Sequence, residues 1–320
     1  MNRFPAAVAA AALLAIAGAA GAQTWPVKPV RIVVGFAAGG STDLVARIVA
    51  QRLGEAWGQN VLVENRAGAS GMIAADLVAK SPPDGYNLLV TPQTSLAVAP
   101  VLTGKATYDA SKDFTPITLI GSTPTLMVVT PSFPARTFAE FVELAKKGGL
   151  AYGSGGIGSS PHMAGELMSA QLGIRMTHVP YKGENPALAD TISGQVPIMF
   201  GNISAALPHV KAGKLRALAN TGSTRSPLAP DVPTMNESGL REFAVATWFG
   251  LLGPAGLPRE LTLRIQRDVA QVIARPEVRD RLVELGVDLV GNTPDQFAAF
   301  LQSEIARYAR VIKEAGIKAE

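Results

Sequence analysis

Short β-branched runs alternate with helix-like stretches along this chain, and this alternation restricts the fold more than any other feature. The apolar run at residues 30–34 precedes a glycine-rich turn and a helix predicted over 43–53. Residues 61–63 then precede a helix predicted over 70–80, and another apolar run follows at 88–90. Strands that alternate with helices of this length indicate βαβ units and a largely parallel sheet.

Two longer apolar stretches divide this pattern into two series. Residues 114–130 are β-branched but interrupted by Gly121 and Pro124, which predicts one strand leaving a first sheet and another strand entering a second. Residues 243–253 form a second candidate crossing. Between the crossings the expected elements are helix 138–146, strand 150–152, helix 161–172, strand 176–179, helix 186–193, strand 196–200, helix 207–212 and strand 215–219.

The C-terminal part is helical and is expected to return to the first series. Leu261, Ile265 and Val269 lie on one helical face. Residues 293–296 (Thr-Pro-Asp-Gln) predict a capping box at the start of the last helix. Two α/β domains joined by two crossings form a clamshell, with domain 1 at residues 23–121 plus 248–320 and domain 2 at 122–247.

The N-terminus has the pattern of a secretory signal peptide over residues 1–22. A positive start at Arg3 is followed by the apolar run 6–20 and then by Ala20-Gly21-Ala22. A membrane anchor is the alternative, but the run is shorter than the roughly 20 residues of a span and is mostly alanine. We expect cleavage after Ala22 and export of the remaining chain.

Composition excludes several classes of chemistry. The 320 residues contain no cysteine, so disulfides, thiolate metal sites, iron–sulfur clusters and a cysteine nucleophile are excluded. Hydrophobic residues make up 48% and charged residues 17%, which excludes a disordered chain. The formal charge of +4 is spread without a basic cluster, so no nucleic-acid partner is expected.

The first candidate binding loop follows the first predicted strand. In open α/β sheets, ligands bind beyond the carboxyl ends of the strands. The loop contains Phe36, Ala37, Ala38, Gly39, Gly40, Ser41 and Asp43. Its glycines allow the backbone to approach a ligand, and Ser41 or Thr42 is expected to cap a helix whose N-terminus favours an anion. The alternative is an ordinary βα turn.

A second glycine-rich loop spans residues 153–162 and carries Ser154, Ser159, Ser160 and His162. Its glycines satisfy the dinucleotide pattern G-x-G-x-x-G, but no acidic residue closes the next strand at 176–179, so the ribose contact is missing. We therefore predict an anion cradle and no nucleotide cofactor.

Two further loops complete the candidate site. Residues 180–185 include Tyr181 and Lys182, and residues 201–204 include Asn202. Hydroxyls, amides and one cation suit a small carboxylate or another polar solute. Whether Lys182 points to the ligand or to solvent stays open.

Catalysis has little support in the sequence. The three histidines are not paired at metal-ligand spacing, and we predict no metal site and no enzyme. Ser160 and His162 could form a hydrolase dyad, but a helix-capping serine and a locally bonded histidine are the simpler interpretation. Trp248 lies in a crossing and could line the cleft, while Met163 and Met168 are expected in the core.

At these loops the chain resembles the Bug-type receptors of tripartite tricarboxylate transporters. The matching segments are residues 36–43, 63–69, 83–86, 113–116, 178–183, 194–196, 208–213, 225–227 and 231–234, in order over nearly all of the chain beyond residue 22.

The resemblance implies a receptor of the periplasm with a periplasmic-binding-protein-like Venus-flytrap fold, in which each domain has a mixed, mostly parallel sheet flanked by helices. We expect a monomer. It also implies a small carboxylate ligand and delivery to a membrane permease; a sensor kinase is the alternative recipient. By resemblance, residues 36–41 hold the ligand carboxylate together with ordered water, and the second domain contributes Ser154, Ser159, Ser160, His162, Tyr181 and Asn202.

The chain departs from the family pattern in two places. Pro197 and Gly201 stand where relatives often carry acidic residues, which favours a plain or aromatic carboxylate over an amino acid. Ala37 replaces a common proline, which predicts a less rigid first loop.

Overall fold

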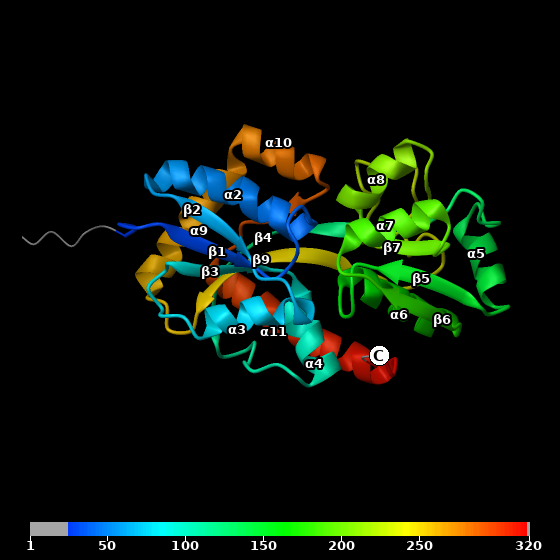
Figure 1. The fold of residues 1–320 in the computed structure, drawn as a ribbon, viewed down its shortest axis with the longest axis horizontal. Coiled ribbons are helices and arrows are strands. Elements are labelled where there is room, and N and C mark those ends of the chain that lie inside the picture. Colours follow the sequence, from blue (N-terminus) through cyan, green and yellow to red (C-terminus); the bar gives the residue numbers. More distant parts are fainter. Residues whose placement is uncertain (1–24, 319–320) are drawn as a thin grey trace, which may run out of the picture.

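The computed structural model describes residues 25–318, so the predicted signal peptide and its cleavage site lie outside the described residues. The described chain forms two lobes that are joined by two long strands, as Figure 1 shows. Among residues 25–318, no helix combines the length and the apolar character needed to cross a bilayer.

The first lobe is built on a mixed sheet. Strands β1 (Val30–Val34), β2 (Val61–Asn65) and β3 (Asn87–Thr91) are parallel, with β1 in the middle, and β3 pairs antiparallel with β9 (Ala246–Pro254). The lobe also contains η1 (Ala69–Gly71), α2 (Ser41–Trp57), α3 (Met72–Ala79), η2 (Thr94–Val98), α4 (Ala99–Thr103), α9 (Arg259–Ala274), α10 (Pro276–Glu284), β10 (Asp288–Leu289) and α11 (Pro294–Glu314).

Strand β1 illustrates why this sheet is covered on both faces. Val30, Ile32 and Val34 belong to the core cluster shared with α2 and α9, whereas Val33 belongs to the cluster on the opposite face, shared with α3 and α11. Successive side chains of a strand point to opposite faces, so buried apolar side chains on both faces of β1 require helices on both. The predicted βαβ organisation is confirmed.

The second lobe repeats this architecture. Its parallel strands β5 (Leu150–Ser154), β6 (Met176–Pro180) and β7 (Ile198–Asn202) follow the order β7-β5-β6. Strand β8 (Arg216–Asn220) pairs antiparallel with the long strand β4 instead. Helices α5 (Phe138–Ala145) and α6 (Ser160–Leu172) cover one face, and α7 (Glu184–Ser193) and α8 (Ile203–Lys211) cover the other.

One strand connects the two lobes without a break. Strand β4 (Phe114–Val129) pairs with β9 over residues 114–124 and with β7 over residues 125–129. The expected interruption at Gly121 and Pro124 is wrong, because β4 is paired through both positions. Gly121 instead admits β10, since a Cβ atom there would lie 2.5 Å from the backbone oxygen of Asp288.

The C-terminal helix begins as predicted. Thr293 Oγ1 accepts a hydrogen bond from the N–H of Gln296, and Gln296 Oε1 accepts one from the N–H of Thr293, so the capping box is confirmed. Phe297 and Leu301 are buried under the first-lobe sheet. Farther along α11, apolar side chains contact the second lobe through Met163.

The exact domain boundaries at 121/122 and 247/248 stay predictions.

Candidate functional site

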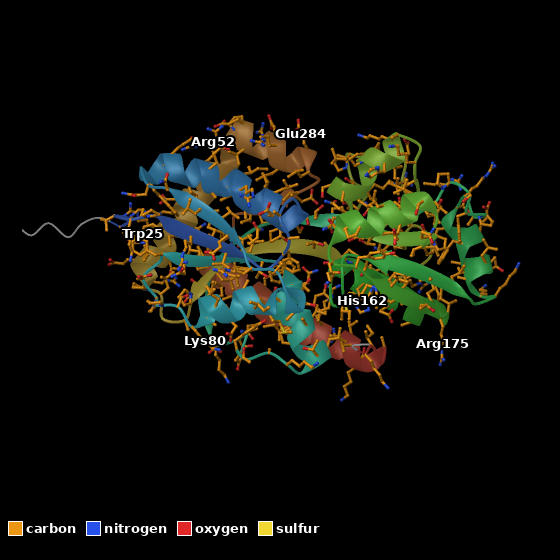
Figure 2. All side chains as sticks on the ribbon, in the orientation of Figure 1. Trp25, Arg52, Lys80, His162, Arg175 and Glu284 are labelled. Carbon is orange, nitrogen blue, oxygen red and sulfur yellow. The ribbon has the colours of Figure 1, made fainter. Side chains whose placement is uncertain are left out.

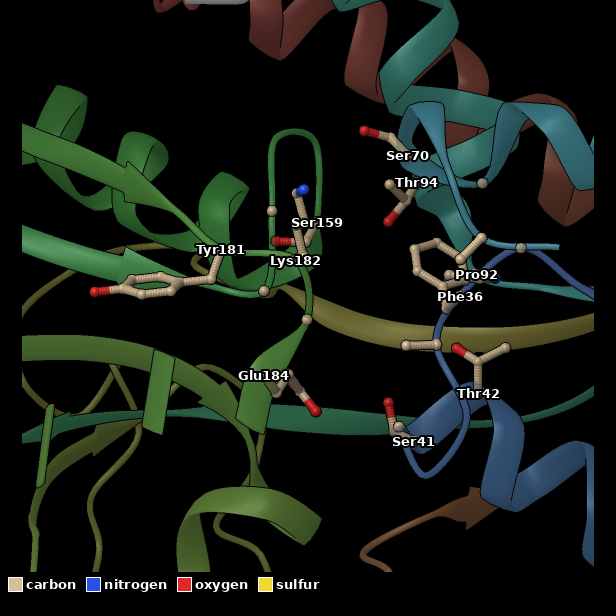
Figure 3. Close-up of a pocket in the computed structure, with 18 of the residues that line it drawn as sticks. Phe36, Ser41, Thr42, Ser70, Pro92, Thr94, Ser159, Tyr181, Lys182 and Glu184 are labelled. Carbon is tan, nitrogen blue, oxygen red and sulfur yellow. The ribbon is translucent and has the colours of Figure 1, made fainter. Parts of the chain in front are cut away.

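A cavity of about 670 Å³ lies between the two lobes. Figure 3 shows loops of the first lobe on one side and loops of the second lobe on the other. Its walls consist of residues 35–38, 40–42, 67–71, 92, 94, 155–157, 159–161, 180–186, 202 and 247.

The β1–α2 loop forms one wall, and hydrogen bonds to Asp43 hold it in place. The Asp43 carboxylate accepts hydrogen bonds from the N–H of Gly39 (2.8 Å), from Arg47 Nε (2.9 Å) and from Asn65 Nδ2 (2.8 Å). Burial alone would raise the pKa of Asp43, but these bonds hold it below its ordinary value. Neither Asp43 nor Gly39 is among the cavity-lining residues, so their part is to shape the loop.

Helix α2 starts differently from the sequence expectation. Gly40 is the N-cap, and no side chain caps the helix, so the expected cap by Ser41 or Thr42 is wrong. The Ser41 hydroxyl instead accepts a hydrogen bond from Asn202 Nδ2 of the other lobe, at 2.9 Å. Because Asp43 orders the loop, Ser41 does not have to cap its own helix.

The first loop packs closely on a second loop that the sequence analysis did not nominate. A Cβ atom on Gly35 would lie 2.6 Å from Gly71 Cα. Gly71 itself has φ of +84°, a conformation that favours glycine. Through this contact the turn at 67–71 joins Phe36 on the cavity wall and brings Ser70 into it. Pro92 and Thr94, after β3, were also missed, although the carboxyl end of a third parallel strand could have indicated them.

In the second lobe, Ser154 supports the glycine-rich loop and does not line the cavity. It is fully buried, and its Oγ lies 2.7 Å from His178 Nε2 and accepts from the N–H of Gly156. Ser159 is the cap of α6 and accepts from the N–H of His162, so the predicted cap at Ser160 is off by one residue.

His162 faces a different space from the cleft. Its Nδ1 accepts a hydrogen bond from the N–H of Gly158 at 3.0 Å, and its ring stacks on His178 with 4.0 Å between centroids. Both rings line a second cavity of about 310 Å³ beside the C-terminal residues 316–318. Burial lowers the pKa of His162 to about 3 and that of His178 to about 4. Figure 2 places His162 near the junction of the lobes.

This arrangement does not support a Ser160–His162 dyad. Ser160 Oγ is hydrogen-bonded to Thr247 Oγ1 at 2.9 Å, and His162 is engaged by Gly158 and His178. Within residues 25–318, no group of three or more metal-binding side chains is close enough to hold an ion.

The β6–α7 loop supplies the remaining wall. Tyr181 presents its ring, while its hydroxyl points away from the cavity (Figure 3) and donates to Asp190 Oδ2 at 2.7 Å. Burial, together with Asp190, raises the pKa of Tyr181 to about 12. Lys182 lines the cavity and is also exposed to solvent. Glu184 belongs to the predicted loop 180–185 but was not singled out from the sequence; it lines the same wall and accepts from the N–H of Asn202 at 3.0 Å.

Hydrogen bonds bridge the cleft at two places. Asn202 reaches Ser41, and Ser70 Oγ donates to the backbone oxygen of Ile157 at 2.9 Å. Thr247, on the crossing strand β9, donates to Asn202 Oδ1 at 2.7 Å. The neighbouring Trp248 does not line the cavity; it is buried, and its Nε1 donates to Glu304 at 3.1 Å.

The structure therefore brings together most of the nominated residues. Those that line the cavity are Phe36, Ala37, Ala38, Gly40, Ser41, Ser159, Ser160, Tyr181 and Asn202. Those that lie outside it are Gly39, Asp43, Ser154 and His162. The side chains of Asp43, Ser154 and His162 instead order the loops by accepting hydrogen bonds from the N–H groups of Gly39, Gly156 and Gly158, respectively.

Comparison with known families identifies the family of this chain. The model of the tripartite tricarboxylate transporter family receptor, TctC, matches residues 45–317. The chain belongs to this family. BugT of Bordetella pertussis is 36% identical to it over 306 residues, which cover 95% of this chain and 94% of BugT. The resemblance to Bug-type receptors is thus confirmed.

Two solved structures share the fold. R. palustris Rpa4515 with adipate is 36% identical, with a TM-score of 0.88 over 92% of this chain and 99% of that one. MatC (Rpa3494) from Rhodopseudomonas palustris with bound malate is 35% identical, with a TM-score of 0.84 over 90% and 100%. This TctC-family chain is accordingly a two-domain solute-binding receptor, and its family and fold are those of substrate-binding proteins.

Proposed function

We propose that this receptor captures a small carboxylate between its lobes in the periplasm and delivers it to the membrane permease of a tripartite tricarboxylate transporter. The observation that carries the proposal is the cavity of about 670 Å³ with the N-terminus of α2 in its wall. The related structures of Rpa4515 with adipate and of MatC with bound malate support a carboxylate ligand.

The proposed carboxylate subsite is the β1–α2 loop. Helix α2 begins at Ser41 without a side-chain cap, so a capping side chain does not occupy its first N–H groups. These groups and the helix dipole favour an anion at this end. Phe36, Ala37, Ala38 and Gly40 form the surrounding wall, and the opposite wall contributes Ser159, Ser160, Tyr181 and Asn202.

Capture follows from closure of the clamshell. A ligand that contacts both walls binds the closed form more tightly than the open form and therefore shifts the population toward closure. The bonds from Asn202 to Ser41 and from Ser70 to Ile157 belong to the closed form, because each joins the two lobes. The surface completed by closure would then dock on the permease.

A thermal-shift screen tests the ligand class. The purified protein is scanned against carboxylates, amino acids, sugars and nucleotides. A ligand at 100 times its dissociation constant adds about 2.7 kcal/mol to the free energy of unfolding, which raises the melting temperature by several degrees. Stabilisation by members of the carboxylate set, amino acids included, supports the proposal, whereas a response to sugars or nucleotides alone contradicts it.

Gene deletion tests whether the receptor delivers its ligand to a permease or to a sensor kinase. Deletion of the gene should abolish uptake of the identified ligand while signalling responses stay intact; the reverse result favours a sensor kinase as the recipient.

Protein recovered from the periplasm should begin at Gln23 by intact mass. A longer N-terminus there contradicts cleavage after Ala22.

A further inference from the structure

Glu184 places an acidic group in the cavity wall. It is the first residue of α7, and its side chain is half-buried. Figure 3 shows the carboxyl group pointing into the cavity, toward Ser41 on the opposite wall. One of its oxygens, Oε1, accepts the N–H of Asn202 at 3.0 Å.

Within the described part of the chain, no cation is paired with this carboxyl group. Among the ion pairs of residues 25–318, none includes Glu184. Burial raises the pKa of Glu184, although the N–H of Asn202 acts in the opposite direction. A partly desolvated carboxylate with a single hydrogen bond is stabilised by any further donor that enters the cavity.

The position of Glu184 limits where on a ligand that donor must be. Asn202 donates to Glu184 through its backbone and to Ser41 through its side chain, so one residue connects Glu184 to the proposed carboxylate loop. The Glu184 carboxyl group also points toward Ser41 of that loop (Figure 3), so a ligand held there would turn the atoms next to its carboxylate toward Glu184. A plain methylene there leaves the two like charges close together without compensation.

We propose that Glu184 is a specificity residue that selects carboxylates with an ammonium or hydroxyl donor on the carbon next to the carboxylate. This role of Glu184 rests on the proposed function. The donor N–H or O–H bonds to the Glu184 carboxylate while the ligand carboxylate occupies the β1–α2 loop. An ammonium group gains more than a hydroxyl, because it also neutralises the acidic charge.

A donor-selecting Glu184 differs from the plain or aromatic carboxylate that the sequence favoured. Pro197 and Gly201, whose lack of charge motivated that preference, do not line the cavity. Pro197 immediately precedes β7, and its oxygen accepts from the N–H of Thr130. The nearest neighbours of a Cβ on Gly201 would be Met199 and Ala206. The acidic charge in the cleft comes from Glu184 instead.

Calorimetric titration with matched ligand trios tests the inference. The trios are aspartate, malate and succinate; glutamate, 2-hydroxyglutarate and glutarate; and alanine, lactate and propionate. In at least one trio, the wild-type protein should bind a donor-bearing member about tenfold or more tighter than the plain one, as expected for a hydrogen bond to a charged group. Glu184→Gln should reduce this ratio to within about threefold.

Control variants separate selectivity from folding. Glu143→Gln removes an equal charge from the exposed face of α5 and should leave the ratio unchanged. Glu184→Asp keeps the charge at a shorter reach and should retain part of the preference. Melting temperatures identify any variant that fails to fold.

The possible results separate the two proposals. Equal binding of plain and donor-bearing carboxylates by the wild-type protein, or an unchanged ratio in Glu184→Gln, overturns the role of Glu184 and leaves carboxylate capture intact. Binding of sugars or nucleotides with no carboxylate response overturns the proposed function itself.

Discussion

Asn202 Nδ2 donates a 2.9 Å hydrogen bond to Ser41 Oγ, and this bond joins the two walls of the cleft. The same asparagine accepts from Thr247 on the crossing strand β9 and donates its backbone N–H to Glu184. Asn202 is 4% exposed, so these contacts are largely shielded from water. One side chain thereby connects the first lobe, the second lobe and the strand between them.

Asn202→Ala should weaken ligand binding about tenfold. The variant loses two side-chain hydrogen bonds, each contributing roughly 0.5–1.5 kcal/mol, and one of them exists only when the cleft is closed. Calorimetric titration with the ligand found in the screen measures the loss. Asn236→Ala is the matched control, because Asn236 makes two hydrogen bonds to the backbone of Phe243 instead. Equal losses of affinity in both variants would contradict a specific role for Asn202.

Gly40→Val should abolish binding and leave the fold intact. Gly40 has φ of −76°, which any residue adopts, and a Cβ atom there would meet only the oxygen of Ala37, at 3.4 Å. The backbone therefore accepts valine, but the added side chain stands on the wall where the carboxylate is proposed to bind. Thermal melting should change by no more than a few degrees. Retained affinity would show that the first loop is not the subsite.

Gly71→Ala should give the opposite result and destabilise the protein. The residue has φ of +84°, and a Cβ atom would lie 2.4 Å from Ser95 Oγ and 3.0 Å from Phe36 Cε2. Strained backbone and overpacking together cost about 1–3 kcal/mol or more. Urea unfolding measures the change, with Gly40→Val as the comparison. An unchanged unfolding midpoint would contradict the tight contact between the two loops.

Glu304→Ala should lower the free energy of unfolding by about 1–3 kcal/mol, because the buried Nε1–H of Trp248 then lacks its acceptor. Glu304 also accepts from Arg307, which in turn donates to the backbone oxygen of Ala244. Urea unfolding followed by tryptophan fluorescence measures the effect. Glu314→Ala, on an exposed position of the same helix, should behave like the wild-type protein. Identical midpoints for both variants would argue against this contact between α11 and β9.

The stacked histidines should make the protein less stable in mild acid. Burial lowers the pKa of His162 to about 3 and that of His178 to about 4, from an ordinary value of 6.5. Between about pH 6.5 and 4 the unfolded chain therefore binds protons that the folded chain does not, and stability falls as the pH falls. The slope approaches about 1.4 kcal/mol per pH unit for each histidine.

His178→Gln removes one of these two groups and should flatten the acid dependence accordingly. Urea unfolding at pH 7, 6, 5 and 4.5 compares the variant with the wild-type protein and with His209→Gln, which removes a histidine outside the pair. If the wild-type and His178→Gln curves fall in parallel, the acid sensitivity arises elsewhere.

Local patterns were sufficient to predict much of this architecture. The alternation of apolar strands and amphipathic helices is a short-range property, and so is the capping box of Thr293 and Gln296, because their partners lie within a few residues. The β1–α2 loop was predicted at the cavity because loops that follow parallel strands lie at the carboxyl edge of the sheet, where open α/β folds bind their ligands. The family was recognisable for the same reason, since its motifs are contiguous.

Long-range contacts were decided only by the tertiary structure. The bond between Asn202 and Ser41 joins residues 161 positions apart, and the stacking of His162 on His178 depends on how α6 packs against β6. Strand β4 also continues through its glycine and its proline, because Gly121 pairs with Phe249 and Pro124 pairs with Ala246 of β9. Sequence periodicity reports which side chains must be buried. Which hydroxyl, amide or carboxyl group then meets which other depends on packing, and that packing placed Glu184 in the cavity.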